Sequence, residues 1–296
     1  PHVPSPVISS VRFTFLGTGT SAGVPAIGCA CPVCTSPDPR DRRLRTSALL
    51  EFTDPGATPR AILIDAGPDL REQALRRAMT RLDAILFTHN HVDHTWGLDE
   101  VRRFNAVQNA PIDVYADAHT DEHLRRVYTH IYERDRNVND SFVATLIPHR
   151  VRPGVPFDLH GLRITPVPLL HGRLPVLGYR IEPADPAAAP PGPVLPLAYC
   201  TDVSAIPTES WALLTGLSTL VLDALRDRRH PTHLTLEQAL GIAERIDASR
   251  TLFVHMSHDL GHAQTTARLQ ASGHAPRMAL AHDGLTLGAD HSCAAE

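Results

Sequence analysis

Short apolar runs that stop at Gly, Pro or charged residues recur along the whole chain, and each predicts a strand. Val11–Leu16 alternates apolar and polar residues, whereas Ala84–Phe87 is apolar throughout. The other predicted strands are Thr46–Phe52, Ala61–Ile64, Ile112–Tyr115, Val155–Leu159, Leu162–Leu170, Leu177–Ile181, Leu197–Cys200, Leu220–Leu225, Thr251–Val254 and Met278–Leu287.

Helical spacing of apolar residues lies between several of these strands. Asp69–Met79 places Leu70, Ala74 and Leu75 on one side and Arg residues on the other. Further helices are predicted at Trp96–Ala106, Thr120–Ile131 and Leu236–Ile246. The mixture indicates an α/β protein, and because no shift in composition divides the 296 residues, we expect one domain over residues 1–296.

Three segments show neither the apolar runs of a strand nor the helical spacing of apolar residues. The polar run Tyr132–Ser141 predicts a mobile loop, either across the mouth of a site or at the contact of a homodimer. Residues 183–196 are rich in Pro and Ala and predict a hairpin insertion without chemistry. Gly17–Gly23 is either an anion-binding loop or a tight corner, but its spacing matches neither a P-loop nor a dinucleotide fingerprint.

Composition and charge limit the class of substrate that the protein is expected to bind and the cellular compartment in which it is expected to lie. The formal net charge of -4 is spread without a basic block, which disfavours binding to a long nucleic acid and favours a small anionic substrate. No apolar stretch is long enough to span a bilayer, and the first residues lack the order of a signal peptide. We therefore expect a cytoplasmic protein with no membrane partner.

The densest candidate chemistry follows the apolar run Ala84–Phe87. Its next residues supply His89, His91, Asp93 and His94. Imidazole nitrogens and carboxylate oxygens are ligands that suit zinc and its first-row neighbours, and a turn at a strand end can aim closely spaced side chains at one point. A surface turn that is merely rich in His, in a chain with 18 His, is the less specific alternative.

A second cluster consists of Cys29, Cys31 and Cys34, within a loop at residues 28–35. In a reducing compartment, crowded thiolates indicate metal ligation rather than disulfides. They can occupy three corners of a tetrahedron, so that zinc needs a fourth ligand from elsewhere. Buried or oxidised cysteines are the alternative.

The motif His89-x-His91-x-Asp93-His94 resembles the signature of the metallo-β-lactamase superfamily. This resemblance implies a four-layer αβ/βα sandwich with two divalent metal ions, Zn or Mn, at the strand ends between its sheets. It implies that Asp65 is structural and supports the metal loop. It assigns His89, His91 and His171 to one ion, Asp93, His94 and His255 to the other, and Asp202 as the bridge between them.

The Cys-x-Cys-x-x-Cys cluster and the pair His255-x-x-His258 resemble the PhnP family of this superfamily, cyclic-phosphate phosphodiesterases of the carbon–phosphorus lyase pathway. The resemblance implies a structural zinc held by Cys29, Cys31, Cys34 and His258. It also makes Asp93 and His233 the catalytic residues, with His233 as the general acid. We expect His230 to be a packing or surface residue.

The function implied by this resemblance is hydrolysis of a small, cyclic phosphodiester by metal-bound hydroxide. Other members of the superfamily offer alternatives: a 3′-tRNA endonuclease, which the absence of a basic arm disfavours, or a lactonase or thioesterase with the same ligands. A metal-dependent carrier of the PqqB type is the alternative from outside the enzymes. Turnover of a phosphodiester separates these classes.

Overall fold

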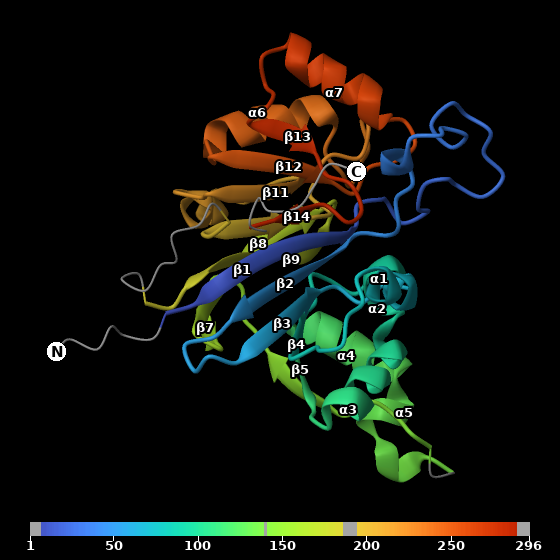
Figure 1. Cartoon of the computed structure of the whole chain (residues 1–296), viewed down its shortest axis with the longest axis vertical. Helices are drawn as coiled ribbons and strands as arrows, with labels where there is room; N and C mark the ends of the chain where they lie inside the picture. The colour runs from blue at the N-terminus through green and yellow to red at the C-terminus, as the bar shows by residue number, and fades with distance from the viewer. Residues whose placement is uncertain (1–6, 139–140, 186–193, 289–296) are drawn as a thin grey trace.

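The computed structural model describes residues 7–138, 141–185 and 194–288, which form two seven-stranded sheets packed face to face (Figure 1). The first sheet has the order β14-β1-β2-β3-β4-β5-β6, and the second has the order β13-β12-β11-β10-β9-β8-β7. The strands of the first sheet are β1 (Ser9–Gly17), β2 (Ser47–Thr53), β3 (Pro59–Ile64), β4 (Ala84–Leu86), β5 (Ile112–Ala116), β6 (Leu146–Arg150) and β14 (Thr286–Leu287). Those of the second are β7 (Phe157–Leu159), β8 (Leu162–His171), β9 (Leu174–Pro183), β10 (Leu197–Cys200), β11 (Thr219–Asp223), β12 (Arg250–Val254) and β13 (Met278–Leu280).

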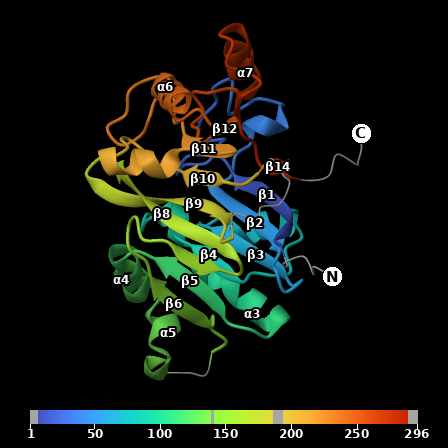
Figure 2. The same cartoon turned by 90° about the vertical axis from the view of Figure 1, so that its left-hand side faces the viewer.

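Helices cover the outer faces of the two sheets, at opposite ends of the molecule (Figures 1 and 2). Those beside the first sheet are α1 (Leu70–Arg76), α2 (Val92–Thr95), α3 (Arg102–Gln108), α4 (Ala118–Val127) and α5 (Thr129–Tyr132). Those beside the second are α6 (Leu236–Ile246) and α7 (His262–Ala271). Short 3-10 helices lie at Pro39–Asp41, Leu98–Val101, Arg134–Arg136 and Thr208–Leu214.

Buried side chains form three apolar layers, as a sandwich of four layers requires. The central layer joins the inner faces of both sheets and contains Phe13, Phe15 and Tyr199. A second layer packs α6 against β10–β12, and a third packs α1, α3 and α4 against β3–β5. The structure thus confirms the predicted αβ/βα sandwich.

Strand direction brings the candidate residues to one edge. β3, β4, β5 and β6 are mutually parallel, as are β10, β11, β12 and β13. Ligands of α/β proteins bind at the carboxyl ends of such strands. Asp65 and the histidine motif follow β3 and β4, while Asp202, Asp223 and His255 end or follow β10, β11 and β12.

Most predicted elements exist, and two agree with the structure at both ends: Leu197–Cys200 and Leu236–Ile246. The strand predicted at Met278–Leu287 is wrong, because this segment divides into β13 of the second sheet and β14 of the first. Strand β6, helix α7 and the 3-10 helix Thr208–Leu214 were not predicted.

The structure describes only part of the segments that were expected to be irregular. The polar run 132–141 includes the 3-10 helix Arg134–Arg136, and its residues 139–140 lie outside the described part of the chain. Residues 186–193 of the Pro/Ala insertion also lie outside it. Across the described ranges, no helix is both long and apolar enough to cross a membrane.

Candidate metal centre

The turn after β4 is held in place by Asp65, which follows β3. The Asp65 carboxylate accepts hydrogen bonds from the Thr88 amide and hydroxyl, both at 2.8 Å, and lies 2.7 Å from His94 Nδ1. Thr88 Oγ1 in turn lies 2.9 Å from His89 Nδ1. These contacts engage the Nδ1 atoms of both histidines, so their Nε2 atoms remain for a ligand. The supporting position predicted for Asp65 agrees with this geometry.

His89, His91 and His171 form the first group of ligand atoms, which lie within 4.8 Å of one another. Their rings are in close contact, with centroids separated by 4.5 Å for His89 and His91 and by 5.1 Å for His91 and His171. His171 ends β8, and its Nδ1 donates to the Thr232 carbonyl at 2.7 Å. His91 is exposed, which leaves this group accessible from solvent.

The second group is buried and consists of Asp93, His94, Asp202 and His255. His94 Nε2 lies 3.2 Å from one oxygen each of Asp93 and Asp202, and His255 Nδ1 lies 3.2 Å from Asp202 Oδ2. Two carboxylates and two imidazoles therefore converge on one small volume.

Asp202 stands between the two groups. Its Oδ2 faces His94 and His255, whereas its Oδ1 lies 4.0 Å from His89 Nε2. Each group thus meets a different oxygen of the same carboxylate. This is the arrangement that a bridging ligand between two cations needs.

The donor set fits divalent cations. Four buried atoms of the two ligand groups have no hydrogen-bond partner among the described residues: His89 Nε2, Asp93 Oδ2, His94 Nε2 and His255 Nδ1. An unpaired buried polar atom is costly, and a cation that accepts these lone pairs removes the cost. Burial alone would raise the pKa of Asp202, but His255 and His94 outweigh it and hold that pKa well below its usual range. The centre therefore favours an ionised carboxylate beside positive charge.

His233 lies at the edge of this centre. Its Nδ1 is 3.0 Å from Asp223 Oδ2, and its Nε2 is 4.0 Å from Asp202 Oδ1. Burial alone would lower the pKa of His233, but the hydrogen bond and charge of Asp223, together with the charges of Asp202 and Asp93, outweigh burial and raise it. His230 is only half-buried, and its Nδ1 contacts Thr232 rather than the centre. The structure therefore brings His233, and not His230, toward the ligands.

Asp223 is the residue of this site that sequence reasoning missed. Its buried carboxylate also accepts from the amides of Val203 and Leu234, at 3.2 and 3.3 Å. Burial raises the pKa of Asp223 to about 6. The signal in the sequence was an acidic residue inside the apolar run Leu220–Leu225, where only a specific partner justifies a charge.

The Cys cluster meets His258 in a third group of ligand atoms, separate from the two at the centre. His258 Nδ1 lies 3.2, 3.5 and 3.3 Å from the Sγ atoms of Cys29, Cys31 and Cys34. All three thiols are free of disulfides. One nitrogen and three sulfur atoms at mutual contact are a donor set for tetrahedral zinc, and they fill its coordination completely.

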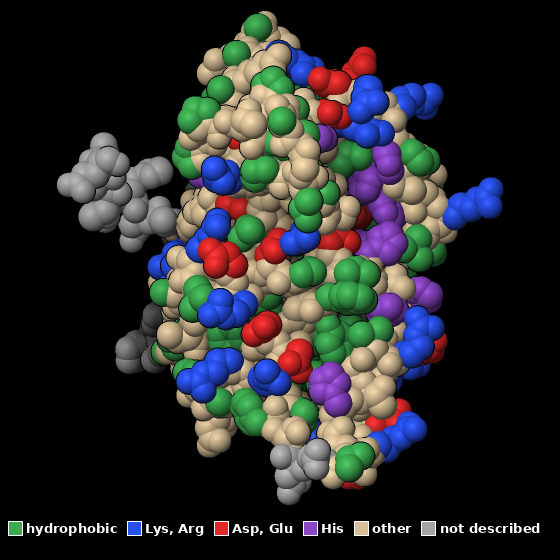
Figure 3. Space-filling model, turned by 90° about the vertical axis from the view of Figure 1, so that its right-hand side faces the viewer, with side chains coloured by type: hydrophobic (Ala, Val, Ile, Leu, Met, Phe, Trp, Pro, Cys, Tyr) green, Lys and Arg blue, Asp and Glu red, His purple; other side chains and the backbone are tan. Residues whose placement is uncertain are grey.

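Buried Arg43 ties this cluster to the loop that carries His258. Its guanidinium donates to the carbonyl oxygens of Ser257 and Leu260, at 2.9 and 2.5 Å, and pairs with Asp41 at 3.2 Å. In the space-filling view, histidine side chains gather in a band along one side of the molecule (Figure 3). Every predicted ligand falls into one of the three groups described above: the two at the centre and the cysteine group.

Comparisons with known proteins agree with this geometry. A family model described as the beta-lactamase superfamily domain matches residues 60–256. A solved structure described as a new diphosphatase from the PhnP family is 40% identical, covers 94% of this chain and 96% of that one, and has a TM-score of 0.79. Zn²⁺-bound PqqB from Methylobacterium extorquens is 21% identical with a TM-score of 0.70, over 93% of this chain and 99% of that one, and shares the fold.

A curated octanoyltransferase from Porphyromonas gingivalis is 35% identical over 249 residues, which make up 84% of this chain. The match covers 46% of that protein, so this chain spans less than half the length of that relative.

Proposed function

This chain belongs to the beta-lactamase superfamily and has its metal-dependent hydrolase fold, and we propose that it hydrolyses a phosphorus–oxygen bond in a small phosphodiester. The family resemblance predicted from its histidine and cysteine motifs is confirmed. The proposal depends above all on one observation: the hydrogen-bonded pair His233 and Asp223 stands beside the two groups of candidate metal ligands. The similar PhnP-family protein is described as a diphosphatase, which supports chemistry at phosphorus.

Each group of residues has a separate task in this proposal. Two divalent ions held by the two ligand groups would supply a nucleophilic water at neutral pH and neutralise charge on the phosphoryl oxygens. Asp202, which faces both groups, fixes their spacing. Asp93 belongs to the second group, where its carboxylate would bind the ion held by that group.

In this proposal, His233 donates a proton to the leaving group. Asp223 holds its Nδ1, so the ring presents Nε2 toward the centre and can carry a proton there. A leaving alkoxide needs such a proton, and a positioned acid supplies it best when its pKa lies near the working pH. Asp223, together with Asp202 and Asp93, raises the pKa of His233 against the effect of burial, which favours the protonated ring.

The test is turnover of bis(p-nitrophenyl) phosphate by protein loaded with Mn or Zn. We expect release of p-nitrophenolate by the wild type and loss of both metal and activity in Asp202→Ala, since each cation then loses a ligand. Asp99→Ala removes a half-buried carboxylate that belongs to none of the ligand groups, and this variant should retain both metal and activity. Full metal occupancy in Asp202→Ala would show that this carboxylate is not a bridge.

The competing functions predict other results. No turnover with any divalent metal would overturn the enzyme proposal and favour a carrier. Hydrolysis of p-nitrophenyl octanoate without hydrolysis of the diester would favour the acyl hydrolases, which share these ligands.

A further inference from the structure

A surface cavity of about 750 Å³ opens directly beside His233. Its walls come from the β8–β9 turn, the segment after β10, the loop before α6 and the first turn of α6. The residues that line it are Gly172, Arg173, Ser204, Arg229, His230, Pro231, Thr232, His233 and Gln238. These include two arginines and no acidic residue, so the cavity has a positive character.

The walls of this cavity are locked together. Gly172 donates to Ser204 Oγ at 2.8 Å, and the neighbouring His171 donates to the Thr232 carbonyl at 2.7 Å. Gly172 has a φ of +64°, and a Cβ at this position would come within 2.8 Å of Thr232 Cγ2. Close packing therefore fixes the turn that carries Arg173 against the loop that carries Arg229.

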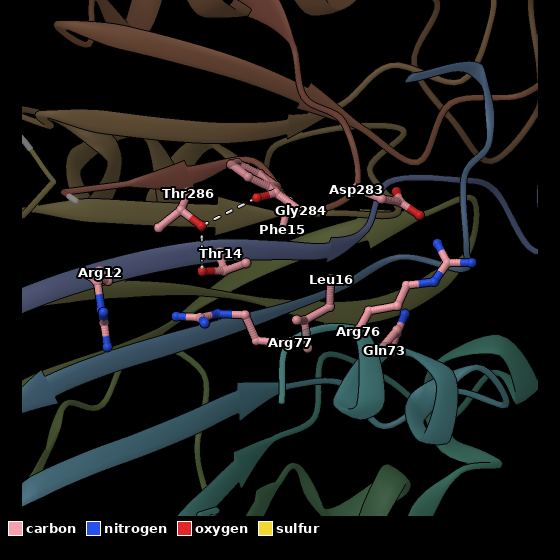
Figure 4. Close-up of a pocket in the computed structure, with 10 residues that line it drawn as sticks. All are labelled: Arg12, Thr14, Phe15, Leu16, Gln73, Arg76, Arg77, Asp283, Gly284 and Thr286. Atoms are coloured by element: carbon pink, nitrogen blue, oxygen red, sulfur yellow. Dashed lines mark hydrogen bonds between the residues drawn. The ribbon is translucent and has the colours of Figure 1, made fainter. Parts of the chain in front are cut away.

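The arginines of this cavity differ from those of another pocket, between α1 and the β1–β14 pair (Figure 4). There, Arg12 and Arg77 both pair with Glu51, and Arg76 pairs with Glu72. The guanidinium groups of Arg173 and Arg229, by contrast, have no ion pair or hydrogen bond with any other described residue. Their charges remain available for an anion in the cavity.

We propose that Arg173 and Arg229 bind a phosphate group carried by the leaving group of the substrate. The inference builds on the proposed function. His233 lines the cavity and also faces Asp202, so it lies between the cavity and the metal ligands. A leaving oxygen that receives its proton from His233 therefore has the rest of the leaving group in the cavity.

The chemistry of the lining residues matches a phosphate. Arginine binds phosphate through paired N–H donors, and those charge-assisted bonds are stronger than neutral ones. Gln238 adds an uncharged amide side chain to the lining, whereas the hydroxyl of Ser204 already donates to the Leu170 carbonyl at 2.9 Å. The preferred substrates are then diphosphates, or diesters whose departing alcohol is itself phosphorylated, over diesters with an uncharged leaving group.

A matched pair of substrates tests this specificity. Dithymidine diphosphate and the p-nitrophenyl ester of thymidine 5′-phosphate share the same attacked phosphate, but only the first releases a phosphorylated group. Arg173→Ala and Arg229→Ala should each lower kcat/KM on the diphosphate by roughly 10- to 100-fold, as loss of a charged hydrogen bond does. Both should stay within about twofold of the wild type on the p-nitrophenyl ester.

Arg103→Ala is the matched control, since Arg103 is an exposed arginine on α3, remote from the cavity lining. Arg103→Ala should leave kcat/KM unchanged on both substrates. Equal losses on both substrates in the Arg173 and Arg229 variants, or no loss on either, would overturn the inference.

A binding measurement keeps the inference separate from catalysis. Calorimetric titration should show that methylenediphosphonate, which cannot be hydrolysed, binds the wild type at least tenfold more tightly than methylphosphonate. The two arginine variants should lose this difference, and unchanged affinities in both would refute the proposed phosphate site. If the wild type hydrolyses neither of these two substrates but shows the binding difference, the proposed reaction fails while the anion site stands.

Discussion

Three residues of the site have a left-handed backbone conformation, which residues other than glycine rarely adopt. Asp65, Asp202 and His255 have φ values of 62°, 56° and 59°. Each follows the carboxyl end of a buried strand and costs of order 1 kcal/mol or more in backbone strain. Such strain persists where the surroundings enforce it, and here it turns each side chain sharply out of the strand toward the centre.

His233 permits the sharpest prediction at this scale. His233→Ala should leave both active-site metals bound and lower kcat by roughly a hundred- to ten-thousand-fold, the usual effect of a positioned acid. The deficit should be smallest for p-nitrophenolate, which departs with little help, and largest for an alkoxide leaving group. Steady-state kinetics on the two kinds of diester measure it.

His230→Ala is the control, because its ring lies 5.2 Å from His233 yet contacts Thr232 instead of the metal ligands. It should lower kcat far less. Equal deficits on both leaving groups would mean that His233 orients the phosphate rather than protonating the leaving oxygen, and a larger deficit for His230→Ala would mean that the acid has been misassigned.

Single residues were predictable where a motif fixed their spacing. His89 and His94 stand within one short turn, so their convergence needed little tertiary information. Asp223 and Arg43 carry no such local pattern. Their partners are His233 and the carbonyl oxygens of Ser257 and Leu260, and only the folded chain brings these together.

At the scale of elements, the pattern of apolar residues predicted strands better than their sheets. The segment Met278–Leu287 is apolar at both ends, but Asp283 between them accepts hydrogen bonds from the amide and hydroxyl of Thr18 and from the Leu44 amide. The chain therefore crosses from β13 to β14 at this point. Strand β6 was missed because most of its residues are exposed and Pro148 interrupts it, and α7 because it buries few apolar residues.

Asp83 connects β3 and β4 and makes their pairing sensitive to acid. Its carboxylate accepts from Arg81 at 2.7 and 2.6 Å, from Arg60 at 3.1 Å and from the Ala61 amide at 2.8 Å. Burial alone would raise the pKa of Asp83, but these donors outweigh it and lower the pKa. The ionised carboxylate is therefore more stable in the folded chain than in the unfolded one.

Asp83→Asn should accordingly lower the free energy of unfolding by about 1–2 kcal/mol at pH 7, a value reduced for the exposure of Arg81. Because the folded pKa is depressed, this stabilisation is present above the ordinary Asp pKa of about 4 and is lost as pH falls below it. Urea denaturation at pH 7, 5 and 3 measures the difference between variant and wild type. A difference that grows toward acid pH would contradict the assignment.

Arg43 makes the Cys cluster dependent on a loop far away in the sequence. Arg43→Met should lower the free energy of unfolding by about 3–5 kcal/mol, because it leaves Asp41 buried without its cation and two carbonyl oxygens without donors. It should also weaken zinc binding by the cluster, since His258 lies within the released loop. The neighbouring Arg42 is exposed, so Arg42→Met should change neither quantity. Normal zinc content in Arg43→Met would show that the cluster holds its loop unaided.

On the scale of the whole molecule, the centre exists only when both sheets meet. The first sheet supplies Asp65 and the motif after β4, and the second supplies His171, Asp202 and His255. Tyr179 of β9 joins the two directly by donating to the Phe87 carbonyl at 2.6 Å. Family motifs predicted this assembly from sequence, whereas apolar periodicity alone could not have paired the two edges.

The cysteine group and the active-site groups differ in a way that metal removal should reveal. The Cys29, Cys31, Cys34 and His258 group would surround an ion with protein donors alone, so the binding free energy of that ion would contribute to folding. The active-site groups leave room for water and substrate beside the exposed His91. Brief EDTA treatment followed by elemental analysis should therefore remove the active-site ions and activity while about one zinc per chain remains, with thermal stability preserved. Removal of that last zinc should need denaturant or long chelation and should lower the melting temperature. Loss of all metal at once from a chain that stays folded would show that the cysteine group is not a structural zinc site.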